Sequence, residues 1–308
     1  MSDRPGVPDD PVPAGGRPTL PLSTSTLVRI SLFWLGLTSI DAVVNAAVAS
    51  RLKFEHLVEP GTEGASLAIV AVLTFIFSVA VQPTVGSISD YASTRWGRRK
   101  PFIVLGASFD AVFLVGIATA NSLLAIAAFA TLLAFSTNIA RGPFQGYVPD
   151  LVPDRQVGLA SSMVGLMQVF GNVLGFALAA IANTQGNVGL AVIAIATVEL
   201  VTMLSVVLRV PNGPAPKPRG DRSWLSIAAE TWGTDILRER SYLWLLASRL
   251  LILMGGAAVL NFINYYLPDV HGLTQEQTGS AFLTMLLAAT IVSVLSIVPA
   301  SRLSDRYG

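Results

Sequence analysis

Long apolar segments alternate with short polar ones along most of this chain. Eight of these segments reach the ~18–20 residues that a helix needs to cross the hydrocarbon core of a bilayer. A soluble domain would break such runs into amphipathic pieces. The pattern therefore predicts an all-α polytopic membrane protein with eight transmembrane helices, over residues 25–49, 65–88, 101–119, 122–148, 158–182, 188–209, 241–267 and 276–300.

The polar segments divide the chain into four parts. Residues 1–24 are rich in Pro and Gly and lack apolar periodicity, so we expect a disordered cytoplasmic tail rather than a signal peptide. Residues 25–209 are predicted to form an N-terminal six-helix bundle. Prolines stop the helix in residues 210–240, which are interpreted as a cytoplasmic linker. Residues 241–308 then form a partial C-terminal bundle of two helices.

Part of the linker, residues 223–240, carries apolar side chains at roughly helical spacing. This spacing favours a helix that lies on the cytoplasmic membrane surface and is anchored by tryptophan. An ordinary loop with two interfacial tryptophans is the alternative. The predicted apolar face consists of Trp224, Leu225, Ile227, Ala228, Trp232 and Ile236.

The few charged residues, 13% of the chain, set the expected orientation. With the N-terminus in the cytoplasm, the inner segments carry 15 Lys and Arg residues, whereas the outer loops carry only Arg51 and Lys53. Short loops rich in Lys and Arg stay in the cytoplasm, so we expect a multi-pass protein of the cell (plasma) membrane with a cytoplasmic N-terminus. The net charge of +1 does not indicate a nucleic-acid partner.

Composition also argues against enzyme chemistry. The chain has no cysteine, which excludes disulfides and thiolate nucleophiles. Its two histidines, His56 and His271, fall in predicted loops. An intramembrane hydrolase would need a Ser–His, paired-Asp or metal-ligating set, so we predict no enzyme, no metal and no cofactor other than a coupling proton.

The densest basic segment is Gly86–Phe102, which reads GSISDYASTRWGRRKPF. Its pattern S-D…R-W-G at Ser89–Gly97 recurs as S-D-R-Y-G at Ser304–Gly308, after the second span of each half. This repeat predicts two related halves, of which the second would need four further helices. We therefore expect a C-terminally incomplete chain, as a fragment or as a truncated gene product.

The same basic segment resembles the loop motif between helices two and three of the major facilitator superfamily. Gly97 follows Asp90 at the seventh position, and this long spacing resembles the sucrose-transporter-like branch, which includes bacterial relatives of sucrose–proton symporters. The stretch Ala140–Gly175 also resembles helices four and five of that branch. Tyr91 departs from the pattern, which usually has a basic residue there. The resemblance implies alternating access between two six-helix bundles, with substrate near the midplane.

The resemblance further implies a role for the loop as a conformational latch. The loop aspartate would meet the loop cations and the N-terminal end of a helix in the second bundle, where a carboxylate is favoured. That contact would hold one conformation closed on the cytoplasmic side. The predicted latch residues are Gly86, Asp90, Arg95, Gly97, Arg98 and Arg99.

Two ionisable residues within the spans are the main candidates for binding and coupling. Such a residue costs about 2.5–3.5 kcal/mol at the centre of a span. Arg141 matches the RGP-type segment of the branch, and it could bind sugar hydroxyls or set the state of a nearby carboxylate; snorkelling to the surface is the alternative. Asp41, in the outer half of its span, could carry a proton, or it could be a protonated or Asn45-bonded wall residue.

Three further charged residues lie within spans. Asp110 is at a depth similar to that of Arg141 on the neighbouring span, so a structural ion pair between them competes with a coupling role. For Glu199 we expect a structural role or a protonated side chain. Arg249 lies deep in the seventh span.

Uncharged polar residues could shape a sugar site, which needs donors, acceptors and aromatic faces. Helix–helix hydrogen bonding is the alternative for each of them. Gly171 and Gly175 are predicted to permit close helix packing. The candidate polar residues are Asn45, Gln82, Asn138, Gln145, Gln168, Asn172, Asn261, Asn264 and Tyr265.

These inferences lead to one expected function and two alternatives. The expected function is a secondary active transporter that imports a disaccharide or glycoside with a proton, in contact with the lipid bilayer. One alternative is an exporter of drugs or metabolites, which would favour an apolar, aromatic cavity. The other is a truncated scaffold that does not transport.

Overall fold

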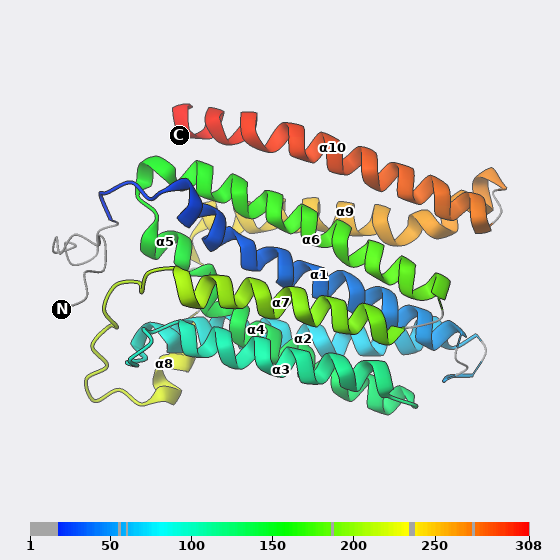
Figure 1. The fold of residues 1–308 in the computed structure, drawn as a ribbon, viewed down its shortest axis with the longest axis horizontal. Helices are drawn as coiled ribbons and strands as arrows, with labels where there is room; N and C mark the ends of the chain where they lie inside the picture. The colour runs from blue at the N-terminus through cyan, green and yellow to red at the C-terminus, as the bar shows by residue number, and fades with distance from the viewer. Residues whose placement is uncertain are drawn as a thin grey trace. The chain divides into compact units, whose positions relative to one another are not determined.

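The computed structural model describes residues 18–54, 57–59, 61–185, 188–233, 238–272 and 275–307, and within these ranges every regular element is a helix (Figure 1). The elements are α1 (Thr24–Phe54), α2 (Glu63–Tyr91), α3 (Lys100–Thr119), α4 (Leu123–Gln145), α5 (Tyr147–Leu151), the 3-10 turn η1 (Asp154–Gln156), α6 (Val157–Gln185), α7 (Val188–Arg209), α8 (Trp224–Glu230), α9 (Arg240–His271) and α10 (Gln275–Tyr307).

Six segments of the described residues are long and apolar enough to cross a membrane, and they coincide with the first six predicted spans. The seventh and eighth predicted spans are helical, as α9 and α10, but the count of eight spans is not confirmed by the described residues. The six segments are Thr24–Asn45, Glu63–Tyr91, Lys100–Thr119, Leu123–Leu151, Asp154–Ala179 and Gly189–Arg209.

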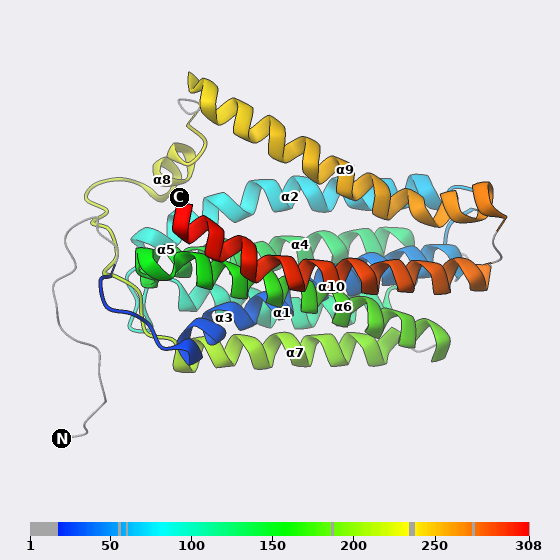
Figure 2. The ribbon, with the colours of Figure 1, turned by 90° about the horizontal axis from the view of Figure 1, so that it is seen from above.

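The chain divides into two compact units, of which the first contains α1 to α7, most of α8 and the end of α10, and the second contains α9 and most of α10. Within the first unit, α1 packs mainly against α6 and α7, α3 packs against α7, and α4 packs against α3 and α2. Figures 1 and 2 show these helices running side by side along the long axis of the bundle. The packing order is therefore α6, α1, α7, α3, α4, α2, and α1 and α4 adjoin only sparsely.

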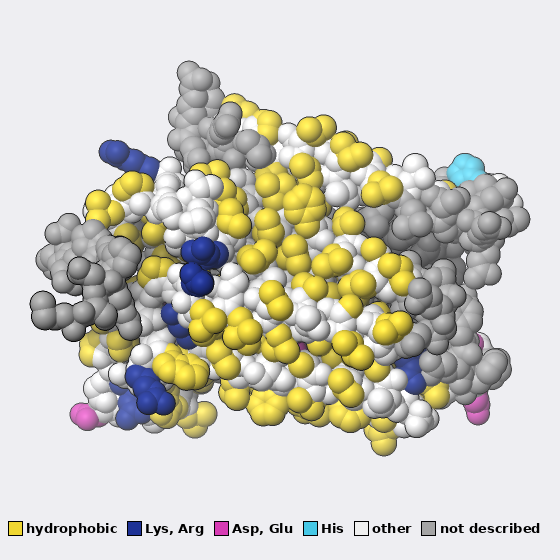
Figure 3. Space-filling view, in the orientation of Figure 1, with side chains coloured by type: hydrophobic (Ala, Val, Ile, Leu, Met, Phe, Trp, Pro, Cys, Tyr) yellow, Lys and Arg dark blue, Asp and Glu magenta, His cyan; other side chains and the backbone are white. Residues whose placement is uncertain are grey.

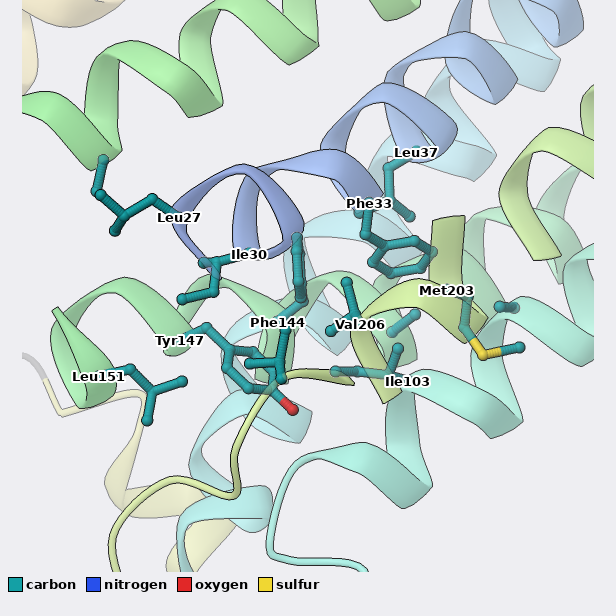
Figure 4. Close-up of a cluster of buried hydrophobic side chains, with 14 of the residues drawn as sticks. Leu27, Ile30, Phe33, Leu37, Ile103, Phe144, Tyr147, Leu151, Met203 and Val206 are labelled. Carbon is teal, nitrogen blue, oxygen red and sulfur yellow. The ribbon is translucent and has the colours of Figure 1, made fainter. Parts of the chain in front are cut away.

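A buried aromatic group joins α4 and α5 to α1 at one end of the bundle (Figure 4). The ring of Phe144 meets the ring of Phe33 edge to face, with centroids 4.9 Å apart, and it also contacts Trp34 and Tyr147. Edge-to-face pairs add about 0.5–1.5 kcal/mol to the burial of their area. This cluster fixes the segment directly after Arg141 against α1.

Glycines allow the closest helix contacts, as predicted for Gly171 and Gly175. A Cβ on Gly175 would lie 2.5 Å from the Ser39 carbonyl oxygen, and one on Gly171 would lie 2.0 Å from Thr38 Oγ1, so α6 rests directly on α1. A Cβ on Gly142 would lie 2.3 Å from the carbonyl oxygen of Gln82, where α4 crosses α2. Only glycine permits contacts this short.

The linker differs from its prediction in one respect. Residues 211–222 form no helix, but the helix that follows, α8, covers only Trp224–Glu230 before a turn at residues 231–232. Ile227 is buried, whereas Trp224, Leu225 and Trp232 are exposed. The predicted helix over residues 223–240 was therefore too long, because the apolar spacing continues past Gly233 but the helix does not. Ile236 lies outside the described residues.

Arg51 also differs from its prediction as an outer-loop cation. It lies within α1, is 4% exposed and donates hydrogen bonds to the carbonyl oxygens of Ile117 and Ala120. These carbonyls belong to the end of α3, where the backbone acceptors lack partners within the helix. A cation is favoured there, so Arg51 caps α3.

Candidate functional site

An ion pair links α1 to α4. Arg141 Nη2 lies 2.6 Å from Asp41 Oδ2. The Asp41 side chain is 46% exposed and that of Arg141 is 18% exposed, so the pair opens at the surface of the bundle instead of being sealed within it. A charge-assisted hydrogen bond of this length is among the stronger polar contacts in proteins.

The fourth span is longer than predicted. α4 is followed by α5, so the candidate span reaches Leu151 instead of ending at residue 148.

A second pair of ionisable groups lies between α3 and α7. Asp110 and Glu199 are each 0% exposed. Asp110 Oδ1 accepts a hydrogen bond from the Ser136 hydroxyl of α4. The carboxyl groups of Asp110 and Glu199 lie within hydrogen-bonding reach of each other. The alternative expectation of an ion pair between Asp110 and Arg141 is wrong for this structure, since Arg141 binds Asp41 instead.

A third charged group lies at one end of the bundle, and we call it the basic-end network. It consists of Asp90, Arg98, Arg99, Asp150 and Lys217. Asp150 Oδ2 lies 2.6 Å from both Arg98 Nη2 and Arg99 Nε, while Asp90 Oδ1 lies 3.0 Å from Arg99 Nη2. Both arginines are buried, and Arg99 also donates to the Pro143 carbonyl oxygen. The network joins the α2–α3 loop to α4 and α5.

The linker is attached to the same network. The Lys217 amide donates to the Asp90 carbonyl oxygen at 2.9 Å, and Lys217 Nζ lies 3.2 Å from Asp90 Oδ2. Lys100 Nζ donates to the Val210 carbonyl oxygen at 2.8 Å. Arg222 stacks on the Tyr91 ring, with 4.9 Å from Cζ to the centroid. These contacts hold residues 210–222 along the α2–α3 loop.

Not every predicted latch residue takes part in this network. Arg95 is exposed and lies outside the ion pairs of the network. Gly97 has φ +93°, a left-handed conformation that glycine adopts without strain, and it turns the loop after Asp90. Gly86 faces Gly142 at the crossing of α2 and α4, where a Cβ would make contact at 3.4 Å.

A cleft of about 250 Å³ lies between α2 and α4, next to the basic-end network. Gln82 and Gln145, two of the candidate polar residues, line it together with Asp90 and Arg99. Both amides can donate and accept hydrogen bonds, so this cleft offers neutral polar groups beside the basic-end network.

Other candidate polar residues have different surroundings. Asn138 is buried, and its amide donates to Ser78 Oγ at 3.0 Å and to the Ala134 carbonyl oxygen, which joins α4 to α2. Asn45 and Asn172 are exposed, and Gln168 is half-buried. The side chains of Asn261, Asn264 and Tyr265 lie outside the described residues.

Comparison with known proteins decides the family. The sequence profile of the Major Facilitator Superfamily matches residues 26–308. The chain belongs to this superfamily. That membership agrees with the all-helical fold and with the loop motif around Asp90.

Several proteins that are similar to this chain are named as transporters. Membrane-associated transporter protein of Mus musculus is 31% identical over 177 residues, which cover 52% of this chain and 32% of the relative. Sucrose transport protein SUC4 of Arabidopsis thaliana is 28% identical over 149 residues, covering 42% of this chain and 29% of the relative. Sucrose transport protein SUT1 of Oryza sativa subsp. japonica is 29% identical over 124 residues, covering 33% and 23%. The chain thus spans between about a quarter and a third of these relatives.

Two residues of this superfamily member were missed by sequence reasoning. Asp150 holds Arg98 and Arg99 together, and Lys217 brings the linker to Asp90. Asp150 follows the fourth span on the side predicted for the loop cations, and this opposite charge was the available indication. Lys217 offered no comparable indication, because its partner depends on the path of an irregular segment.

Proposed function

We propose that this chain is part of a secondary active transporter that carries a disaccharide or glycoside together with a proton, by alternating access. The observation that carries this proposal is the partly exposed Asp41–Arg141 ion pair, which joins two helices that can span a membrane. The names of the sucrose transport proteins support a sugar as the substrate class. The basic-end network would face the cytoplasm, following the positive-inside rule.

The chemistry of the pair suits both parts of this function. Sugar hydroxyls donate and accept hydrogen bonds, so a carboxylate and a guanidinium together can bind neighbouring hydroxyls. Protonation of Asp41 would remove the charge that holds Arg141 and release its donors for substrate. Gln82 and Gln145 in the cleft between α2 and α4 would add neutral donors and acceptors.

The basic-end network gives this transporter its conformational control. In the structure Asp90 is held by Arg99 on one side and by Lys217 of the linker on the other. We propose that this carboxylate is the latch on the cytoplasmic side, and that Gly97 and Asp150 position its arginine partners.

Uptake by the full-length gene product in proteoliposomes tests the proposal. The assay uses a panel of labelled disaccharides and glycosides, with and without an inward proton gradient. We expect the gradient to drive accumulation in the wild type. Asp41→Asn should leave exchange of substrate intact and remove the response to the gradient.

The control for this experiment is Asp90→Asn, which removes a carboxylate at the end of the bundle. Any uptake that this variant retains should still respond to the proton gradient. Uptake by Asp41→Asn that follows the proton gradient as in the wild type would exclude Asp41 as the proton carrier. Export of apolar compounds without any sugar uptake would replace the proposal by the exporter alternative.

A further inference from the structure

Asp110 and Glu199 form a carboxyl pair that the proposed transport step does not use. Both side chains are fully buried, between α3 and α7 in the interior of the bundle. The two carboxyl groups lie within hydrogen-bonding reach of each other. One oxygen of the pair, Asp110 Oδ1, is bound by the hydroxyl of Ser136. Asp110 Oδ2 and both Glu199 oxygens receive no hydrogen from another group.

Two ionised carboxylates do not account for this arrangement. They would place like charges in contact in a region shielded from water, and each buried charge needs a partner of opposite sign or several donors. Three carboxylate oxygens of the pair would also lack donors. A single proton on the pair relieves both problems, because it removes one of the two charges and supplies an O–H donor that joins two of the three unpaired oxygens.

The charged groups around the pair are few, and they connect it to the exposed ion pair. Arg141 on α4 is near enough to act electrostatically on both carboxyls, and Asp41 on α1 acts on Glu199. α6 carries no charged residue. The other charges of α1, α3 and α7 whose side chains are described lie toward helix ends, at Arg29, Arg51, Lys100 and Arg209.

Close packing of α1 on α7 brings the helix that carries Asp41 against the backbone of Glu199. α1 crosses α7 at Gly36, where a Cβ would lie 3.0 Å from the Glu199 backbone and 2.6 Å from Thr202 Oγ1. Asp41 follows Gly36 by five residues, or about 7–8 Å along the helix. Arg141 uses Nη2 for Asp41, while its Nε has no hydrogen-bond partner. One guanidinium therefore binds the partly exposed Asp41 carboxylate and acts electrostatically on both carboxyls of the buried pair.

We propose that Asp110 and Glu199 hold one proton between them, and that this carboxyl pair is a second proton-binding site, linked through Arg141 to Asp41. Loading and release transfer a proton between the pair and water, and no bond other than O–H forms or breaks. The proton link to transport rests on the proposed function, whereas the shared proton does not. Arg141 acts as a positioning residue, because a change of charge at one carboxyl site alters how its guanidinium stabilises charge at the other.

Infrared difference spectroscopy of the purified chain in liposomes tests the shared proton. A protonated carboxyl gives a carbonyl stretching band that a carboxylate lacks. We expect this band at neutral pH in the wild type, altered in Asp110→Asn and in Glu199→Gln, and absent when both substitutions are combined. Glu63→Gln, which changes an acid in the first turn of α2, is the matched carboxyl control and should keep the band. Circular dichroism checks that each variant is folded.

Three outcomes would overturn the shared proton: no band in the wild type, an unchanged band in either single variant, or a band that persists in the double variant. If the double variant does not fold, wild-type chain grown with heavy-carbon aspartate or heavy-carbon glutamate replaces it. A band that shifts with neither label then contradicts the proposal.

The link to Arg141 has its own readout. Arg141→Gln should change the pH at which the band appears, whereas Arg209→Gln, an exposed cation at the end of α7, should not. Equal behaviour of the two variants would contradict the link. These spectra require no transport, so they remain decisive for the carboxyl pair even if sugar uptake fails and the proposed function is abandoned.

Discussion

The Asp41–Arg141 pair and the Asp110–Glu199 pair lie in the same bundle but in different surroundings. The first joins opposite charges at a partly exposed position, and the second joins two acids that water does not reach. Charges can persist where solvent and a partner stabilise them, whereas two buried acids need a proton. The comparison teaches that helix packing, and not residue type alone, decides whether an acid meets solvent and a cation or another acid.

The largest effect is expected from changing the exposed pair. Arg141→Lys keeps the positive charge but loses the planar guanidinium that binds two acceptors in a fixed geometry. We expect uptake by the full-length protein to fall roughly a hundredfold, as for other small displacements of binding groups. Arg209→Lys, at the end of α7, is the matched control. Normal uptake by Arg141→Lys would remove this residue from the site.

A substitution in the contact between α6 and α1 should lower stability next to the exposed pair without touching the buried pair. Gly175→Ala places a Cβ 2.5 Å from the Ser39 carbonyl oxygen and 2.6 Å from the Cβ of Ala42, next to Asp41. Overpacking of this kind costs about 1–3 kcal/mol of stability. Thermal unfolding in detergent should show the loss for Gly175→Ala and none for Gly64→Ala, where a Cβ meets nothing within 4 Å. Equal stabilities would show that α6 can move away from α1.

The buried pair should be sensitive to the loss of one partner. Glu199→Leu leaves Asp110 in the interior without its neighbour, and an unsatisfied buried polar group costs about 1–3 kcal/mol. Glu199→Gln preserves the shape and a donor, so it should cost less. Thermal unfolding of the two variants measures the difference. A leucine variant as stable as the glutamine variant would argue against a hydrogen bond between the two acids.

The smallest effect is expected where a charge pair is mostly exposed. The side chain of Lys217 is 57% exposed, and surface ion pairs contribute about 0–1 kcal/mol. Lys217→Ala should therefore lower stability by less than ~1 kcal/mol, and high salt should reduce the difference further. Arg219→Ala in the same linker is the control. A loss of several kcal/mol would mean that the linker is part of the bundle's core.

The positions of the six spans were predictable because the length of an apolar run decides whether a helix can cross a membrane. The packing of Gly171 and Gly175 on α1 was predictable for a similar reason, since their spacing places both on one helix face. The length of α8 was not, because apolar spacing alone does not show where a short helix ends.

The candidate site was predictable only residue by residue. Asp41, Arg141 and Asp110 stood out as charges within apolar runs, but their partners depend on how four helices pack. Arg51 was predicted in a loop because helix α1 continues beyond the apolar run that defines its span. The sequence therefore identified the charged side chains within apolar spans, and only the helix packing showed which of them contact one another.

A double-mutant cycle on uptake tests the central claim that Asp41 and Arg141 act as one unit. Full-length wild type, Asp41→Asn, Arg141→Gln and the double variant would be compared in proteoliposomes under an imposed proton gradient. Because the two residues share one interaction, the account predicts that the double variant loses no more gradient-driven uptake than the worse single variant. Losses that multiply would show that the two residues act independently, and would contradict the account.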